Sequence, residues 1–211
     1  MDEHVMVATR HSLHAVAERL LAGPQYRETG EIRLQVTPGG FGQFTGPLRV
    51  EGAEIVGPGT RVPLRGRIGD IAAVLGVEAG EPADLYAEHA EFGADDELAV
   101  DPTAAGLLLG WFARGDQAMR RFAPSEEPIL WPEHFDLGIA LDEVNYGVSP
   151  GDSGHPLPYA YVGPWRTRPV CSTSQRSAGS AAVVVPSSTS TTTRCPSAAS
   201  SSPTTSASGS R

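Results

Sequence analysis

The chain has 211 residues, and its two cysteines, Cys171 and Cys195, lie in the last 46 residues, so residues 1–165 contain neither a disulfide framework nor a thiolate zinc site. All 16 basic residues are arginine. Residues 1–165 hold 11 of these arginines and all 25 acidic residues, which gives this part of the chain a formal charge of −14. A negative charge of this size opposes binding to nucleic acid. No apolar run approaches the roughly 20 residues that cross a bilayer, and the N-terminus lacks the order of a signal peptide, so we expect a cytoplasmic protein without membrane partners.

The N-terminal third predicts a helix followed by short strands. Apolar residues recur at helical spacing over residues 12–22, and Gly23-Pro24 is typical of a helix end. Residues 31–37 alternate between apolar and polar, which is typical of a half-buried strand. After a turn at residues 38–40, further strands are expected over 41–45 and 48–56, interrupted by Gly52, and an antiparallel meander is the simplest topology.

Two further helices are predicted in the middle of the chain. A short one covers residues 68–75 and ends at Gly76, and an acidic surface loop is expected over 77–96. The next begins at Asp101-Pro102, with Asp101 as N-cap and proline at the first helical position. Its predicted core stripe consists of Leu108, Trp111, Phe112, Met119 and Phe122.

The C-terminal part of the domain predicts two strands. Residues 129–141 form one strand-like run that places Trp131 and Phe135 on one face and His134 and Asp136 on the other. A proline-rich loop and a last strand over 159–162 follow. The predicted fold class is therefore α+β, a single domain over residues 1–165 with a mostly antiparallel sheet and about three helices.

Three segments of this region resemble one protein family. They are Trp131-Pro-Glu-His-Phe-Asp136, Tyr146-Gly-Val-Ser-Pro-Gly-Asp152 and Pro158-Tyr-Ala-Tyr-Val-Gly-Pro-Trp165. Together they are similar to the core of uncharacterised bacterial proteins, of actinobacterial type, that are classified only as a domain of unknown function. The resemblance covers about 35 residues and implies no activity.

A polar site is predicted within these segments. A reversal of the chain after residue 149 could bring Asp152 and His155 beside His134 and Asp136, and two imidazoles with two carboxylates suit a divalent metal such as zinc, manganese or ferrous iron. The same groups could run general acid–base chemistry, with Glu133, His134 and Asp136 as the candidate catalytic residues. The alternative gives them structural roles, in which Asp152 closes an Asx-turn after Pro150-Gly151.

Aromatic residues concentrate near the same segments and predict a small-molecule pocket. Trp131, Tyr146, Tyr159 and Tyr161 are the candidate ligand-binding residues, and an ordinary aromatic core edge explains them equally well. Outside this region, His11, His14 and His89 have no partner in the sequence pattern, and we expect all three to be solvated.

The last 46 residues have a different composition. Ser and Thr make up 22 of residues 166–211, and Leu, Ile, Phe, Tyr, Trp, Asp and Glu are all absent, so we expect a disordered tail. Codons with G or C in the second position encode Ser, Pro, Thr, Ala, Arg, Gly and Cys, and these types dominate the tail. A GC-rich gene read in a shifted frame has the same composition, because the G or C of the third codon position then falls in the second position.

Two functions remain open from the sequence. The first is a binding module whose aromatic and polar end, residues 131–165, holds a small ligand or a partner protein. The second is a metal-assisted hydrolase or isomerase that uses His134, Asp136, Asp152 and His155, with Glu133 as base.

Overall fold

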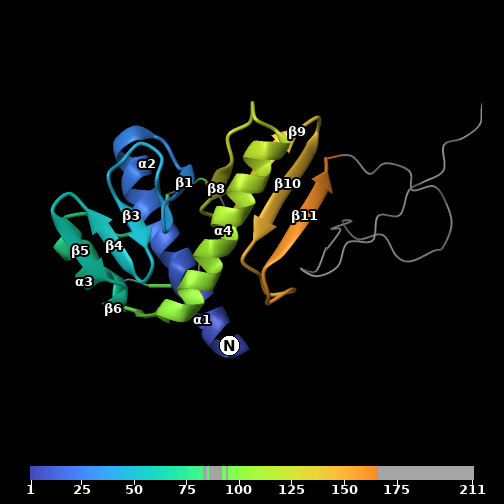
Figure 1. Ribbon diagram of the computed structural model, residues 1–211. Coiled ribbons are helices and arrows are strands. Elements are labelled where there is room, and N and C mark those ends of the chain that lie inside the picture. The colour runs from blue at the N-terminus through green and yellow to red at the C-terminus, as the bar shows by residue number, and fades with distance from the viewer. Residues whose placement is uncertain (83–84, 86–91, 94, 166–211) are drawn as a thin grey trace, which may run out of the picture.

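A computed structural model of the protein describes residues 1–82, 85, 92–93 and 95–165 (Figure 1). The predicted tail, residues 166–211, lies outside the described residues, as do His89 and much of the predicted loop over 77–96. The described part of the chain contains three helical regions and a nine-stranded antiparallel sheet, which confirms the predicted α+β class.

The first helical region is longer than predicted. It runs from Glu3 to Thr29 as α1 (Glu3–Val16), a π-helical turn η1 (Ala17–Ala22) and α2 (Gly23–Thr29). The predicted end at Gly23-Pro24 is wrong. The amide of Gly23 donates to the carbonyl of Glu18 in the π-helical turn, and the next residue, Pro24, has no N–H that would need a helical acceptor, so the helix continues. The helix ends instead at Gly30, whose φ of 74° is left-handed.

The first half of the sheet is the predicted meander. Its strands are β1 (Leu34–Thr37), β2 (Gly40–Gln43), β3 (Arg49–Glu51), β4 (Glu54–Gly57) and β5 (Thr60–Pro63), and each pairs with the next in antiparallel register. The predicted break at Gly52 separates β3 from β4, and Gly52 has a φ of 59°. β5 was not predicted from the sequence.

The middle of the chain confirms both predicted helices. α3 (Ile68–Leu75) ends at Gly76, which has a φ of 71°. α4 (Pro102–Phe122) has Asp101 as its N-cap, and the Asp101 side chain accepts hydrogen bonds from the amides of Thr103 and Ala104 at 2.9 Å. Two short strands, β6 (Arg65–Arg67) and β7 (Glu97–Ala99), form a separate two-stranded sheet.

The second half of the sheet differs from the prediction at two points, because one predicted strand is a hairpin and the strand Val144–Ser149 was not predicted. The run over 129–141 is a hairpin, β8 (Ile129–Trp131) and β9 (Asp136–Leu141), rather than one strand. Pro132 cannot donate to a sheet ladder, and the chain reverses over residues 132–135, where Phe135 has a φ of 50°. β10 (Val144–Ser149) and the predicted last strand, β11 (Tyr159–Pro164), complete the order β11-β10-β9-β8-β1-β2-β3-β4-β5.

The core lies between the helices and the sheet. Figure 1 shows α4 across the middle of the molecule, with β9–β11 on one side of it and β3–β5 on the other. Of the predicted α4 stripe, Leu108, Phe112 and Met119 are buried, Trp111 is half-buried and Phe122 is 57% exposed. None of the described helices is long and apolar enough to cross a membrane.

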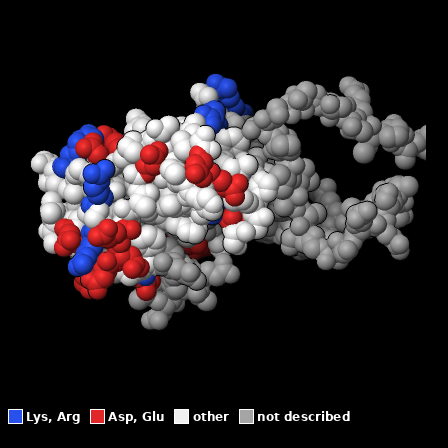
Figure 2. Space-filling view, turned by 90° about the horizontal axis from the view of Figure 1, so that it is seen from below, with Lys and Arg blue, Asp and Glu red and all other residues white. Residues whose placement is uncertain are grey.

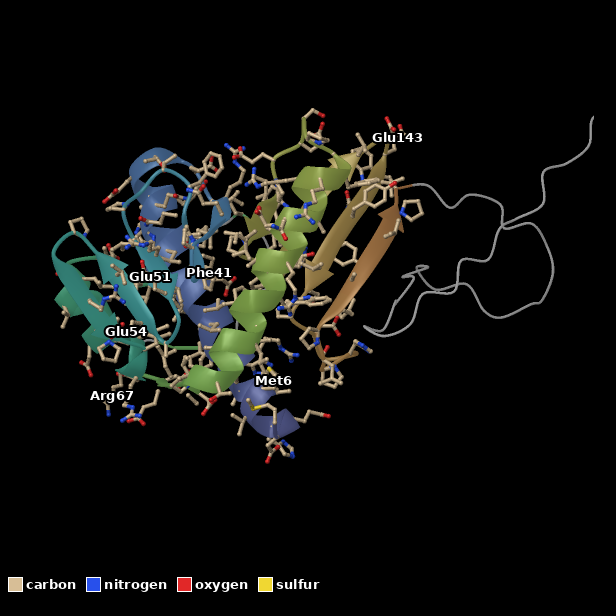
Figure 3. All side chains as sticks on the ribbon, in the orientation of Figure 1. Met6, Phe41, Glu51, Glu54, Arg67 and Glu143 are labelled. Carbon is tan, nitrogen blue, oxygen red and sulfur yellow. The ribbon has the colours of Figure 1, made fainter. Side chains whose placement is uncertain are left out.

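Charged side chains gather at one end of the molecule. Figure 2 shows acidic and basic side chains mixed at the end that holds β3–β5, while the middle of the same face is mostly uncharged. Arg61 contributes to this cluster through ion pairs of 2.7 Å to Glu51 and Glu54, and both glutamates are labelled in Figure 3. These pairs are exposed and contribute little to stability.

Candidate functional site

The cross-strand register of β8–β11 places a set of polar and aromatic residues on one face of the sheet. Residues directly opposite one another in antiparallel strands share a face, and the pairs are Trp131 with Asp136, Gly138 with Gly147, Gly147 with Tyr161, and Ser149 with Tyr159. We call this set the Asp136 face. The opposite face packs toward α4, where Val148 would contact a Cβ added at Gly115 at 2.4 Å.

Two glycines make room for the side chain of Tyr161. A Cβ at Gly147 would lie 2.4 Å from Tyr161 Cζ, and a Cβ at Gly138 would lie 3.2 Å from Tyr161 Oη. The ring therefore lies across β10 and β9, and its hydroxyl donates a hydrogen bond to Asp136 Oδ2. The two glycines are the reason that a tyrosine on β11 reaches an aspartate two strands away.

One carboxylate oxygen of Asp136 has no hydrogen-bond partner in the described part of the chain. Oδ2 accepts from Tyr161, but Oδ1 is buried and has no hydrogen-bond partner among the described residues. Burial raises the pKa of Asp136, while the hydrogen bond from Tyr161, the nearby His134 and the backbone N–H of Asp136 itself act in the opposite direction. Burial and the Asp136 carboxylate also raise the pKa of Tyr161, which keeps its hydroxyl protonated as a donor.

Glu133 and His134 lie in the turn before Asp136. Burial and the Asp136 carboxylate raise the pKa of Glu133, and His134 opposes the shift. His134 Nε2 is 3.8 Å from Glu133 Oε1, and the His134 side chain is 59% exposed. The predicted strand face shared by His134 and Asp136 is therefore not formed, because His134 belongs to the turn.

A second tyrosine–aspartate pair stands at the neighbouring end of β11. Asp152 Oδ1 accepts from the amides of Gly154 and His155 at 2.7 Å, and Tyr159 Oη donates to Oδ2 at 2.5 Å. Burial alone would raise the pKa of Asp152, but these hydrogen bonds and Arg10 outweigh it and lower the pKa. The structural alternative, an Asx-turn closed by Asp152, is confirmed.

Helix α1 contributes two side chains that sequence reasoning missed. Arg10 donates to the carbonyl of Pro156 at 3.0 Å. His14 Nε2 lies 2.7 Å from the carbonyl oxygen of Pro132, its ring stacks on Phe135 with centroids 5.4 Å apart, and burial lowers its pKa to about 4. The expectation of a solvated His14 is wrong, although Leu13 and Ala17 beside it already placed it next to the core-facing stripe of the helix.

The predicted metal site is not assembled. No group of three or more His, Cys, Asp or Glu residues within the described ranges is placed to hold a metal ion, and this includes the set His134, Asp136, Asp152 and His155. Each aspartate is instead bonded to its own tyrosine, and His134 and His155 lie in different turns.

The four predicted ligand-binding aromatics are divided between the two faces of the sheet. Trp131, Tyr159 and Tyr161 lie on the Asp136 face, where the ring centroids of the two tyrosines are 6.3 Å apart. Tyr146 lies on the opposite face and packs against Phe122, with ring centroids 5.0 Å apart. The geometry therefore groups three of the four with Asp136 and assigns Tyr146 to packing against α4.

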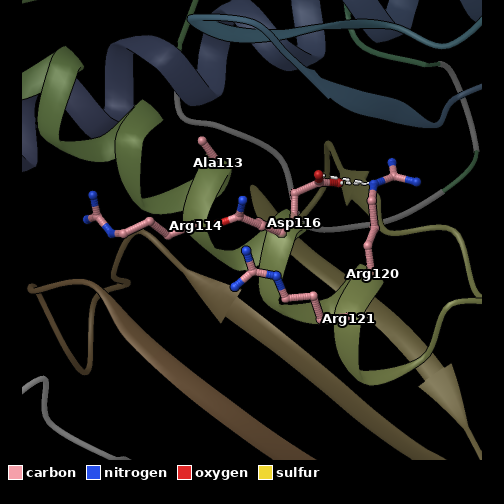
Figure 4. Close-up of a pocket in the computed structure, with 6 residues that line it drawn as sticks. Ala113, Arg114, Asp116, Arg120 and Arg121 are labelled. Carbon is pink, nitrogen blue, oxygen red and sulfur yellow. Dashed lines mark hydrogen bonds and ion pairs between the residues drawn. The ribbon is translucent and has the colours of Figure 1, made fainter.

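A shallow pocket on α4 is distinct from this face. It is lined by Ala113, Arg114, Asp116, Gln117, Arg120 and Arg121 (Figure 4). All six residues come from one helix, and Asp116 already pairs with Arg120 at 3.0 Å. A pocket wall made by one helix does not enclose a ligand. None of the candidate site residues predicted from the sequence lines this pocket.

Comparison of the chain with protein-family models, with curated proteins and with solved structures gives no significant match.

Proposed function

We propose that the protein is a binding module of the bacterial cytoplasm and that the Asp136 face holds a small ligand. The observation that carries the proposal is the buried Oδ1 of Asp136, which lacks a partner among the described residues. A buried acceptor left unpaired costs about 1–3 kcal/mol, and a ligand that donates to it recovers that free energy. Unsatisfied groups of this kind are rare in folded proteins and call for an explanation.

The surroundings of Asp136 suit such a ligand. Trp131 and Tyr161 are half-buried beside the carboxylate and offer apolar ring surface, a common component of small-molecule sites. The adjoining turn carries His134, and a side chain that is 59% exposed can move with little loss of packing. We propose that this movement opens the path to Oδ1.

The metal-assisted hydrolase or isomerase has less support. It requires three or more ligands around one ion, and the described residues offer no such group. The raised pKa of Asp136 is also explained by burial alone.

Amide NMR during a screen of small aromatic fragments tests the proposal. Binding to the Asp136 face shifts the amide signals of Gly138 and Gly147 and leaves that of Gly115, beneath α4, unchanged. Tyr161→Phe weakens the binding because it frees Oδ2 and loosens the carboxylate, while Tyr146→Phe, on the opposite face, does not. A screen in which no fragment moves the two glycine signals would refute the proposal.

A further inference from the structure

Asp136 and Glu133, in the adjoining turn, place two carboxyl groups and their acceptor atoms beside the Asp136 face. Asp136 Oδ1 has no partner among the described residues, and an ionised carboxylate only accepts hydrogen bonds. Tyr161 uses its proton on Oδ2, so its remaining lone pair is also an acceptor. A ligand that fits these atoms supplies donors.

No arginine within the described residues neutralises this charge. Glu133 has its ion-pair contact with His134, at 3.8 Å, and Asp136 has no ion pair with any residue that the structure describes. Arg10 is directed elsewhere, to the carbonyl of Pro156 and to His11, and lies near Asp152. Two neighbouring carboxyl groups, Asp136 and Glu133, therefore have no arginine partner among the described residues.

The charge balance and the aromatic rings select among ligand classes. An anion would meet two carboxyl groups and no arginine. A neutral donor satisfies Oδ1, but a charge-assisted hydrogen bond is roughly twice as strong as a neutral one. The faces of Trp131 and Tyr161 also attract cations and provide area for an apolar body. An ammonium group on a small apolar or aromatic body meets all three conditions.

We infer that the Asp136 face binds an organic amine, whose ammonium group donates to Asp136 Oδ1 with Glu133 nearby and whose apolar body rests on Trp131 and Tyr161. This inference rests on the proposed function and specifies the ligand class of the same site. The buried, unpaired oxygen is the observation that separates it from an ordinary acidic surface.

Three probes of one shape and different charge test the inference. Phenethylamine, 2-phenylethanol and 3-phenylpropionate are titrated into the full chain while the amides of Gly138 and Gly147 are followed by NMR. The amine is expected to bind at least tenfold more tightly than the alcohol, and the acid most weakly. Asp136→Asn is expected to remove the preference for the amine, while Asp142→Asn, at the far tip of the β9–β10 hairpin beside the Glu143 labelled in Figure 3, preserves it.

Glu133→Gln provides a second variant, because it removes charge from a turn and leaves the strands intact. It is expected to reduce the preference for the amine by about threefold to tenfold. Binding of the alcohol or the acid at the two glycines with equal or higher affinity would overturn the amine inference and leave the ligand site standing. If none of the three probes shifts the glycine signals while the fragment screen finds a ligand there, the amine inference alone fails; if the screen also finds none, the proposed site fails with it.

Discussion

Gly147→Ala is expected to destabilise the protein through the side chain of Tyr161. The added Cβ would lie 2.4 Å from Tyr161 Cζ and Oη, whereas carbon contacts need roughly 3.5 Å, so the ring must move by about 1 Å. Overpacking costs about 1–3 kcal/mol, and loss of the bond to the Asp136 carboxylate adds about 1.5–3 kcal/mol. Alanine in a strand returns about 0.5–1 kcal/mol, and the net loss is therefore about 1.5–5.5 kcal/mol.

Urea unfolding of a double-mutant cycle measures this effect. In the Tyr161→Ala background the clash is absent, so Gly147→Ala is expected to be neutral or stabilising by about 0.5–1 kcal/mol. Gly163→Ala is the matched control, because its Cβ would meet Asn145 Cβ at 4.0 Å, an ordinary contact. Equal destabilisation by Gly147→Ala with and without the Tyr161 ring would refute the account of how Tyr161 reaches Asp136.

Three further predictions concern the residues that hold the fold around the site. Burial lowers the pKa of His14 from 6.5 to about 4, so the folded state favours the neutral imidazole, and the stability that depends on it is full above pH 6.5 and is lost toward pH 4, by up to about 3 kcal/mol. His14→Gln should flatten this part of the pH dependence of the unfolding free energy measured in urea, and an unchanged pH profile would contradict the buried, neutral state of His14. Gln43→Leu leaves the Leu21 carbonyl and the Leu48 amide without their 3.0 Å partner, so thermal unfolding should show a loss of about 2–4 kcal/mol, against a change near zero for the exposed Gln117→Leu. Asp152→Ala should cost about 1–2 kcal/mol in the same assay through loss of its turn bonds, and a stabilised variant would contradict the structural role.

Local signals in the sequence predicted the elements whose ends are set by one or two residues. Gly76 ends α3 and Asp101-Pro102 begins α4, because a left-handed glycine and an N-cap act on their own backbone. The break at Gly52 was predicted for the same reason, since this glycine is also left-handed. These features need no knowledge of the rest of the chain.

The features that the sequence analysis missed depend on distant partners. The alternation over residues 129–141 continues through the turn, so the pattern gave no sign that Phe135 turns inward and packs against His14 and Phe112. The contact between Asp136 and Tyr161 spans 25 residues and depends on the registers of two strand pairs. Metal ligation was predicted from residue types together with an assumed strand and chain reversal, and the fold instead directs those residues to separate partners.

A crystal structure of the protein with phenethylamine would show whether the amine binds at Asp136. The ammonium nitrogen is expected within about 3.2 Å of Asp136 Oδ1, the distance of a hydrogen bond, with the phenyl ring against Trp131 or Tyr161. This expectation would be contradicted by an amine bound elsewhere, or by a saturated complex in which Asp136 Oδ1 still lacks a partner.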